Sequence, residues 1–256
     1  IACTVWRGSN QVEVPRGVVH THGNVLANID LIRDAFRIEA TTRGVIWLPL
    51  YHDMGLITCL TVLCHAQSMR LMSPLAFLRD PIEWLRTIAR ERATHSGGPN
   101  FAFDLCARKI SPADLATLDL SSWQVAFNGA EPVRGETLEL FARTFAPCGF
   151  RREALLPCYG LAEATLLVSA GPVGTGPVDL AVSEAGLARQ RVESPDQRSK
   201  ARRLTASGRT LEGAVQCSDP GVVSRDPLRV WPCSAAQAVR RRGLPLAPPG
   251  QASTRP

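Results

Sequence analysis

The chain has 256 residues, of which 45% are hydrophobic and 20% are charged, and its formal net charge is +6. This composition excludes a chain that is disordered throughout and a collagen-like or low-complexity repeat. No apolar run reaches the ~20 residues that a membrane-spanning helix requires. The sequence starts at Ile1 without a basic and then apolar leader, so we expect neither a membrane span nor a signal peptide.

Charge and proline are distributed unevenly along the chain. Residues 1–171 hold 16 Lys and Arg against 16 Asp and Glu, whereas residues 172–256 hold 13 against 7. Ten of the 19 prolines lie in this last third, where Trp231 is the only aromatic residue. Because such a segment buries little apolar surface, we expect residues 1–171 to form the core and residues 220–256 to be an irregular tail. The basic tail lacks interleaved aromatic residues, which favours a solvated segment over a nucleic-acid-binding one.

The eight cysteines are too sparse for a disulfide scaffold. Five of them lie inside apolar stretches, at positions 59, 64, 106, 148 and 158, and no CxxC pair or Cys/His metal spacing occurs. We therefore expect buried free thiols in a reducing compartment, which points to the cytoplasm.

The predicted elements begin with a helix that follows residues 22–24. Its buried stripe recurs at helical spacing and consists of Leu26, Ile29, Ile32 and Phe36. A strand buried on both faces is predicted at 45–48, and an apolar core helix at 55–66. Asp53 is available as the N-cap of that helix.

The middle of the chain repeats this alternation. A second short strand is predicted at 69–72, and residues 80–83 predict a helix start with a capping box and proline at its first position. A strand at 93–96 and a helix at 100–110 follow, and residues 111–114 repeat the cap-and-proline pattern.

The last predicted elements are a strand at 123–127, a helix marked by Leu138, Phe141 and Phe145, a strand at 155–158 and a helix from Leu161. Short apolar strands that alternate with amphipathic helices predict an α/β fold, in which a largely parallel sheet is covered by helices on both faces. In such sheets ligands bind beyond the carboxyl ends of the strands.

Four loops follow predicted strands, at residues 48–56, 96–101, 128–132 and 159–165. Each combines glycine, which lets a ligand approach the backbone closely, with one or two polar side chains. Taken singly, each loop could equally be a solvated turn. Together they read LPLYHDMGL, SGGPNFAFDLC, DLSSWQVAFNGAEPVR and YGLAEATLLVS.

This wording and order resemble the fatty-acyl-AMP ligases of the adenylate-forming, AMP-binding superfamily. The resemblance is close over residues 15–171, which it identifies as part of the N-terminal AMP-binding domain, and fainter to about 219. It implies an enzyme that joins a fatty acid to AMP from ATP with Mg²⁺. The acyl group would then pass to an acyl carrier protein of a polyketide or non-ribosomal peptide synthase. The alternatives are a long-chain acyl-CoA synthetase and a non-catalytic nucleotide- or acyl-binding remnant.

The resemblance also implies roles for single residues. Glu163 matches the Mg²⁺ carboxylate, although a glutamate in a first helical turn can also simply offset the helix dipole. Tyr159 matches the aromatic residue that packs on adenine, and a core tyrosine is the alternative. The expected nucleotide-binding residues are Asn128, Gly129, Ala130, Glu131, Pro132, Tyr159, Gly160, Leu161 and Ala162. Alanine at the last position is typical of this branch.

His52 matches the histidine between the acyl pocket and the adenylate. A fatty carboxylate is already ionised at neutral pH and needs no general base, so we expect His52 to position or gate the substrate. The expected acyl-pocket residues are His52, Ser96, Gly97, Gly98, Pro99, Asn100 and Phe101. The two glycines should leave room for an alkyl chain.

The sequence departs from the family at both ends. Residues 1–14 lack the Ser/Thr/Gly-rich phosphate loop, and Val12 and Val14 favour a strand there. Residues 174–205 resemble the insertion of fatty-acyl-AMP ligases that is thought to hinder coenzyme A, and residues 207–211 its return into the domain. The likeness fades after 219, before the hinge aspartate and the small C-terminal domain with its catalytic lysine. We therefore expect little turnover from these residues alone and interpret the chain as a truncated or frame-disrupted product.

Overall fold

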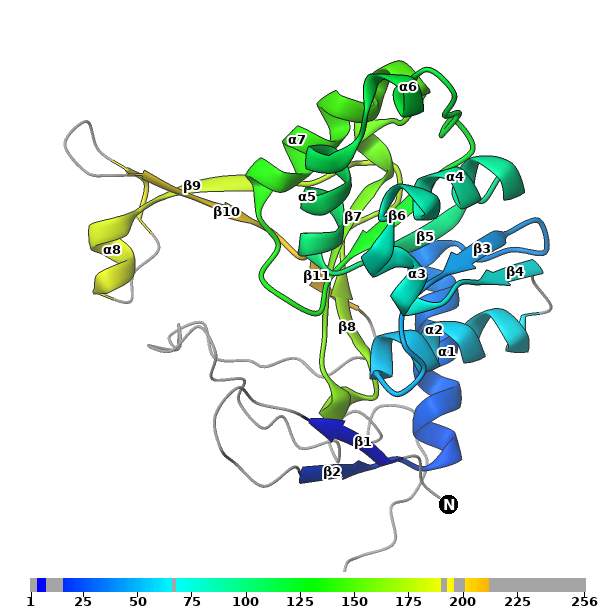
Figure 1. The fold of residues 1–256 in the computed structure, drawn as a ribbon. Helices are drawn as coiled ribbons and strands as arrows, with labels where there is room; N and C mark the ends of the chain where they lie inside the picture. The colour runs from blue at the N-terminus through cyan, green and yellow to red at the C-terminus, as the bar shows by residue number, and fades with distance from the viewer. Residues whose placement is uncertain (1–3, 8–15, 66–67, 190–192, 196–200, 212–256) are drawn as a thin grey trace, which may run out of the picture.

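The computed structural model describes residues 4–7, 16–65, 68–189, 193–195 and 201–211. Its centre is a seven-stranded sheet in the order β11-β8-β7-β6-β5-β3-β4 (Figure 1). The predicted strand at Val12 and Val14 and the predicted irregular tail at 220–256 lie outside the described residues.

Five neighbouring strands form the parallel part of the sheet. They are β7 (Leu155–Gly160), β6 (Val125–Asn128), β5 (His95–Gly98), β3 (Arg43–Ile46) and β4 (Ser68–Leu71). Two further strands, β8 (Leu167–Ala170) and β11 (Arg209–Thr210), extend the sheet in antiparallel pairing beyond β7. The predicted α/β fold is thus confirmed, with strand boundaries that shift by up to two residues from those predicted.

Helices cover both faces of the sheet. On one face lie α1 (His22–Phe36) and α2 (Asp53–Cys64), and on the other α4 (Ile82–Glu91), α5 (Asn100–Lys109) and α7 (Gly135–Phe145) (Figure 1). Two short helices, α3 (Pro74–Arg79) and α6 (Pro112–Leu115), complete the connections on this second face. The connection after β3 runs through α2 on one face, whereas the connection after its parallel neighbour β5 runs through α5 on the other face. The order of the strands therefore reverses between β3 and β5, and ligand crevices form at such points in parallel sheets.

The first helix begins at His22, a few residues earlier than predicted, and the N-caps of two other helices differ from the predicted ones. The N-cap of α2 is His52 and not Asp53, which is the first helical residue. The Met54 N–H donates to His52 Nδ1 at 3.1 Å and to Asp53 Oδ1 at 2.6 Å. In α4, Pro81 is the N-cap rather than the first helical residue, and the Ile82 N–H is capped by Asp80 Oδ1 at 3.1 Å. Each acidic side chain still caps its helix, one position away from where the pattern placed it.

The largest error of prediction concerns the segment after β7. Instead of a helix from Leu161, a 3₁₀ turn at Ala162–Ala164 leads into β8, which runs back along β7. The Leu161 N–H donates to Leu166 O at 2.9 Å and closes this reversal. The apolar run that suggested a helix also suits a strand buried at the edge of the parallel part, and the tertiary pairing decides between them.

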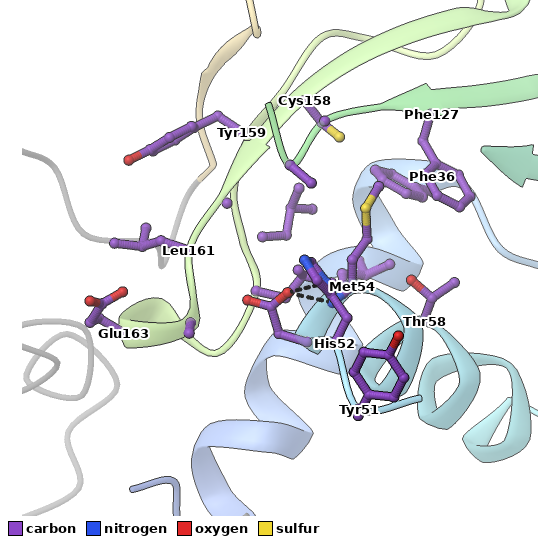
Figure 2. Close-up of a pocket in the computed structure, with 18 residues that line it drawn as sticks. Phe36, Tyr51, His52, Met54, Thr58, Phe127, Cys158, Tyr159, Leu161 and Glu163 are labelled. Atoms are coloured by element: carbon purple, nitrogen blue, oxygen red, sulfur yellow. Dashed lines mark hydrogen bonds and ion pairs between the residues drawn. The ribbon is translucent and has the colours of Figure 1, made fainter. Parts of the chain in front are cut away.

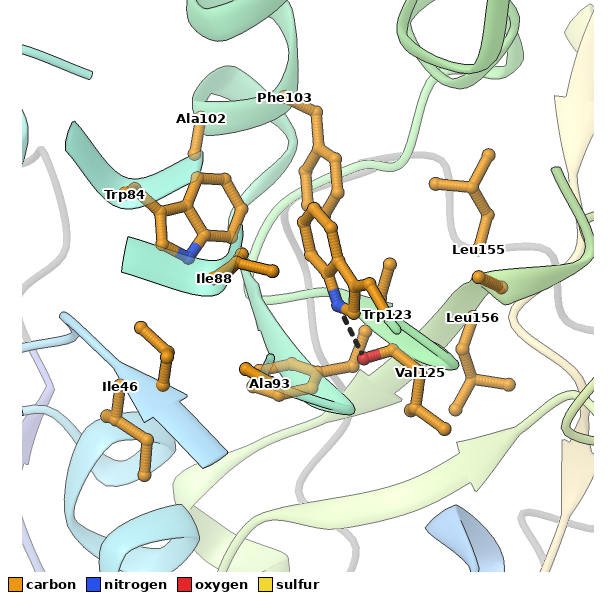
Figure 3. Packing of buried hydrophobic residues seen from close by; sticks show 14 of the residues in the cluster. Ile46, Trp84, Ile88, Ala93, Ala102, Phe103, Trp123, Val125, Leu155 and Leu156 are labelled. Atoms are coloured by element: carbon orange, nitrogen blue, oxygen red, sulfur yellow. Dashed lines mark hydrogen bonds between the residues drawn. The ribbon is translucent and has the colours of Figure 1, made fainter. Parts of the chain in front are cut away.

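Aromatic residues form the core between the sheet and the α4–α5–α7 face (Figure 3). The rings of Trp84 and Trp123 meet edge to face at 5.3 Å between centroids, and both residues are fully buried. Each indole N–H finds a partner: Trp84 Nε1 donates to Ser96 Oγ at 2.8 Å and Trp123 Nε1 to Val125 O at 3.0 Å. The core is therefore apolar without leaving these donors unpaired.

A hairpin extends from this body. It consists of β9 (Asp179–Ser183) and β10 (Ala201–Thr205), with α8 (Glu184–Ala188) after its first strand (Figure 1). At its base Arg203 is hydrogen-bonded to Asp179 and forms an ion pair with Glu139 of α7 at 3.7 Å. A second antiparallel pair joins β1 (Thr4–Arg7) and β2 (Arg16–Val19).

Four of the five apolar-stretch cysteines are buried and free, as predicted, but Cys64 at the end of α2 is exposed. Among the described helices, none is long and apolar enough to cross a bilayer.

Candidate functional site

A cavity of about 390 Å³ lies at the carboxyl ends of β6 and β7, between the sheet and the α1–α2 face. It collects residues from four parts of the chain: α1, the start of α2, the end of β6 with the loop after it, and the end of β7 with the loop after it (Figure 2). Eight of the predicted site residues line it, namely His52, Gly129, Ala130, Tyr159, Gly160, Leu161, Ala162 and Glu163. His52 and Glu163 thus open onto the same cavity.

The remaining predicted site residues do not line this cavity. Asn128 is fully buried, and neither polar atom of its side chain has a hydrogen-bond partner among the described residues. Glu131 and Pro132 line a second cavity of about 270 Å³ together with Asn100 and Phe101. The loop after β6 therefore divides its residues between two cavities.

The loop after β5 is packed more tightly than the two glycines suggested. A Cβ on Gly97 would lie 2.1 Å from Phe127 O, and one on Gly98 would lie 2.7 Å from the Trp47 ring. The room beside both glycines is thus taken by Phe127 and Trp47 of the protein itself. Ser96 is also internal, because its hydroxyl donates to Val45 O at 2.6 Å.

Asn100 joins this loop to the one that precedes α7. Its side-chain carbonyl accepts from the Arg134 N–H at 3.0 Å, and its amide group donates to Thr137 Oγ1 at 3.3 Å. Pro99, the N-cap of α5, makes no side-chain cap hydrogen bond. The loop after β5 is therefore connected to the loop after β6 by specific hydrogen bonds.

His52 stands at the amino end of α2 with its side chain half exposed. Its Nδ1 lies 2.8 Å from Asp53 Oδ1, and this hydrogen bond raises the pKa of His52 above its ordinary value. With a proton on Nδ1 the ring donates to Asp53 Oδ1, and with its proton on Nε2 alone it accepts from the Met54 N–H at 3.1 Å instead. The raised pKa increases the fraction of His52 that is positively charged near neutral pH.

The end of β7 is bent where it reaches the cavity. A bulge at Tyr159 and Gly160 shifts the register with β8, and Tyr159 is 41% exposed. A Cβ on Gly160 would lie 2.1 Å from Leu166 O, so only glycine fits the bulge. Bulges re-aim neighbouring side chains at the edges of sheets. Here the bulge presents the Tyr159 ring at the cavity's edge.

Glu163 lies in the 3₁₀ turn after β7, and Figure 2 shows it at the end of the cavity opposite Phe36 and Phe127. No group of three or more His, Cys, Asp or Glu side chains is gathered for a metal anywhere in the described ranges. A single carboxylate nevertheless fits Mg²⁺, which is commonly held by one or two carboxylates together with substrate phosphates and water. The residues present therefore suit a magnesium ion shared with a nucleotide, not one enclosed by the protein.

The apolar wall of the cavity was not assigned to the site from the sequence. Ile32 and Phe36 of α1, Met54 of α2 and Phe127 of β6 all line it. The Phe36 and Phe127 rings stack at 5.6 Å between centroids. The helical spacing of Ile32 and Phe36 predicts correctly that they are buried, although Leu26 of the same predicted stripe is 55% exposed. Only the position of α1 and α2 over the strand ends shows that the wall residues face a cavity.

Cys158 also lines the cavity, but burial raises the pKa of its thiol to about 12. At neutral pH the thiol is protonated and is a poor nucleophile. Burial therefore makes Cys158 part of the apolar wall of the cavity.

Comparison with known proteins agrees with this geometry. The family profile of AMP-binding enzymes matches residues 14–194. The chain is 40% identical over 243 residues to the medium-chain-fatty-acid–acyl-carrier-protein ligase JamA of Moorena producens, covering 90% of this chain and 40% of that protein. It is 39% identical to the corresponding ligase TtuA of Teredinibacter turnerae over 204 residues, covering 79% of this chain and 32% of that protein.

Solved structures give the same result. The fatty acyl-adenylate ligase from L. pneumophila, in complex with acyl adenylate and pyrophosphate, superimposes with a TM-score of 0.77 and 42% identity. That match covers 81% of this chain and 37% of the solved chain. The chain thus spans about two fifths or less of the relatives it matches. With a family match over more than half of its residues and a cavity at the expected strand ends, the chain belongs to the AMP-binding enzyme family.

Proposed function

We propose that this chain provides the nucleotide- and acyl-binding part of a fatty-acyl-AMP ligase. The reaction joins a fatty acid carboxylate to the α-phosphorus of ATP and releases pyrophosphate. The observation that carries the proposal is that one cavity combines Tyr159, Ala130, Glu163 and His52 with a wall of aromatic and aliphatic side chains. That combination suits a ligand with a planar base, a charged centre and an apolar chain.

The polar end of the cavity is assigned to the nucleotide. Tyr159 packs on the adenine ring, and Gly129 and Ala130 offer backbone groups to its edge. Ala130 has φ 67°, a left-handed conformation that is uncommon for alanine and is typical of backbone held for function. Gly160, Leu161 and Ala162 continue the same surface on the other side of the base.

Glu163 is assigned to magnesium. A bound Mg²⁺ would neutralise charge on the phosphates, on which phosphoryl and nucleotidyl transfer largely depend. His52 holds the fatty carboxylate near the nucleotide, because its raised pKa favours a positive charge at the amino end of α2. No proton needs to be removed from an acid that is already ionised.

The apolar end of the cavity is assigned to the start of the acyl chain. The stacked Phe36 and Phe127 rings and Met54 form its wall. We retain residues 96–101 as neighbours of the acyl path, because Phe101 is 43% exposed and packs edge to face on Trp47 at 6.3 Å. In this proposal residues 96–101 support the aromatic side chains that border the acyl path, and they do not themselves provide space for the acyl chain.

The acyl acceptor is proposed to be the thiol of an acyl carrier protein of a polyketide or non-ribosomal peptide synthase, in the cytoplasm. The names of JamA and TtuA support a carrier protein over coenzyme A. The hairpin of β9 and β10 lies within the segment that resembles the ligase insertion. We accordingly divide the chain into residues 1–171 as part of the AMP-binding domain, 172–219 as insertion and return, and 220–256 as a tail.

Titration calorimetry with a non-hydrolysable dodecanoyl sulfamoyl adenosine tests the site. Saturable one-to-one binding is expected, and Tyr159→Ala should weaken it about tenfold through the lost stacking. Leu78→Ala, an exposed position on α3 outside the cavity, is the matched control. Absence of saturable binding to the unaltered chain contradicts the proposal.

The acceptor is tested in a chimera. The matching segment of JamA is replaced by this chain, and acyl transfer from radiolabelled fatty acid is measured with carrier protein and with coenzyme A. Transfer to the carrier protein is expected to dominate. Equal rates with coenzyme A would assign the chain to acyl-CoA synthetases and leave adenylate formation intact.

A further inference from the structure

Asn28 of α1 is connected to the turn that carries Glu163, 135 positions further along the chain. Its Nδ2 donates to Leu167 O at 3.0 Å and to Ala164 O at 3.3 Å. Its Oδ1 accepts from the Leu167 N–H at 3.0 Å. Asn28 is buried, with 7% of its surface exposed. One side chain on the helix thus holds both ends of the segment after Glu163, by one hydrogen bond to Ala164 at the end of the turn and two to Leu167 at the start of β8.

These contacts define the orientation of the amide group. Two backbone carbonyls need a donor and one N–H needs an acceptor, so only one of the two possible flips satisfies all three. A side chain of similar size without both functions would leave buried backbone groups unpaired. The site thus requires an asparagine and not merely a small polar residue.

The turn itself has a costly backbone conformation. Thr165, the residue after Ala164, has φ 76° and ψ −61°, which is the rare classic γ-turn geometry. Thr165 is buried at 4% exposure, and its Oγ1 lies 3.4 Å from Nδ1 of the buried His20. Such a conformation persists only where the surroundings hold it in place. His20 contacts Thr165 itself, and Asn28 holds Ala164 before it and Leu167 two residues after it.

The helix that carries Asn28 is fixed at both ends. A reciprocal capping box between Thr21 and Asn24 closes its start. At its end, His95 Nε2 of β5 is hydrogen-bonded to Phe36 O at 2.8 Å. Ile32 and Phe36 of the same helix line the cavity. A rigid element of this kind holds a functional group more accurately than a free loop does.

We propose that Asn28 is a positioning residue that fixes the turn bearing Glu163, so that the Glu163 carboxylate meets the magnesium-bound phosphates of the nucleotide. This inference rests on the proposed function and adds to it a residue that does not line the cavity. The strained Thr165 sets the direction of the turn, and the three bonds of Asn28 maintain it. Asn28 acts through Glu163 and touches no reacting atom.

The test uses Asn28→Asp, which keeps the shape and the acceptor for Leu167 but removes both donated hydrogen bonds. Affinity is measured by calorimetry for Mg·ATP and for AMP without metal. Misplacing a carboxylate by a fraction of an ångström to one ångström should weaken Mg·ATP binding about tenfold. Binding of AMP, which needs no magnesium, should change less than about twofold. Asp34→Asn, on the exposed face of α1, is the matched control and should change neither.

A double-mutant cycle separates positioning from a general structural effect. If Asn28 acts through Glu163, Asn28→Asp should cost less than about twofold for Mg·ATP in a Glu163→Gln background. A full tenfold loss in that background, or an equal loss for AMP in the single variant, overturns the proposal. So does unchanged Mg·ATP affinity in Asn28→Asp.

Hydrogen exchange of the unaltered chain tests the proposal even if the Asn28→Asp variant does not fold. This measurement does not depend on nucleotide binding. In the unaltered chain the Leu167 amide should exchange as slowly as the Val125 amide of β6. Exchange at the rate of an open loop overturns the attachment by Asn28. If the unaltered chain binds no Mg·ATP, the proposed function fails, and slow exchange at Leu167 still supports the attachment.

Discussion

The carboxylate of Glu131 accepts a hydrogen bond of 2.6 Å from the Phe101 backbone N–H, so the loop after β6 caps the helix that follows β5. The resemblance implies a nucleotide-binding role for Glu131 and an acyl-pocket role for Phe101. The contact joins the two loops, and a shift of one is transmitted to the other. Glu131 thereby serves as a helix cap supplied from a distant part of the chain.

Replacing Glu131 by alanine removes this cap. Because Glu131 and the contact are exposed, the free energy of unfolding should fall by about 1 kcal/mol, measured by urea denaturation. Glu131→Gln retains a neutral acceptor and should lose less. An equal loss of unfolding free energy in Glu131→Ala and Glu131→Gln would mean that the hydrogen bond to the Phe101 N–H contributes nothing to stability.

His95 gives the fold a dependence on pH. It is buried between Thr94 and Phe36 O, and burial lowers its pKa below the ordinary 6.5. The unfolded chain therefore binds a proton at a higher pH than the folded chain does. The contribution of neutral His95 to the free energy of unfolding should be fully present above pH 6.5. It should be lost as the pH falls below that value, by at most about 1.4 kcal/mol per pH unit.

The measurement compares urea unfolding of the unaltered chain and of His95→Gln between pH 7.5 and 5. The difference between their stabilities should shrink as the pH falls. His20, whose pKa is also lowered by burial, acts in the same direction, whereas the raised pKa of His52 acts in the opposite one. A difference that is constant across this range would contradict the assignment to His95.

Ser96 is expected to contribute to stability more than its size suggests. Its hydroxyl connects Trp84 Nε1 to Val45 O, and all three groups are buried. Ser96→Ala leaves one donor and one acceptor unpaired, so the free energy of unfolding should fall by about 1–3 kcal/mol. Thr117→Ala, whose hydroxyl is exposed, is the control and should change stability by less than about 0.5 kcal/mol. A similar small change in Ser96→Ala would show that the two groups find other partners.

Asp179 should hold the two strands of the hairpin together at its base. Its carboxylate, 11% exposed, is hydrogen-bonded to Arg203 and to Thr205 Oγ1 at 2.7 Å. Asp179→Asn should increase amide exchange throughout β9 and β10, while exchange in β6 stays unchanged, because the contact lies at the base of a separate two-stranded sheet. Glu193→Gln, in the exposed ion pair with Arg189, is the control. Faster exchange in β6 would show that the contact supports the whole fold.

The sequence predicts the parallel part of the fold because its strands are short and apolar and its helices carry clear stripes. It predicts that His52, Tyr159 and Glu163 share a cavity, because each follows a strand and parallel strands end at one edge. The reversal after β7 could not be predicted in this way, since the apolar run at Leu166 and Leu167 suits a helix and a strand equally. The contacts that select the strand are its pairing with β7 and the hydrogen bonds of Asn28, and the local sequence pattern predicts neither of them.

The functions of single residues in the loops were harder to predict than their location. The sequence predicts correctly that another group lies close to the backbone at Gly97 and Gly98. That group is not a ligand, however, but Phe127 and Trp47 of the same chain. Whether a glycine admits a ligand or a neighbouring ring depends on packing between strands. That packing depends on which strands are neighbours in the sheet, and the spacing of residues along the chain does not predict the order of the strands.

The two halves of the sheet meet at β3 and β5, where only two residue pairs are in register, Gly44 with His95 and Val45 with Ser96. The cavity draws one wall from residues 32–58 and the other from residues 127–167, so it forms only after this junction has closed. Contacts across about a hundred residues are late and slow to form during folding, because the loop between them must first be ordered. A nucleotide held in the cavity would bind the closed state alone and would slow separation of the two halves. Such a ligand should therefore leave the folding rate constant nearly unchanged and should lower the unfolding rate constant.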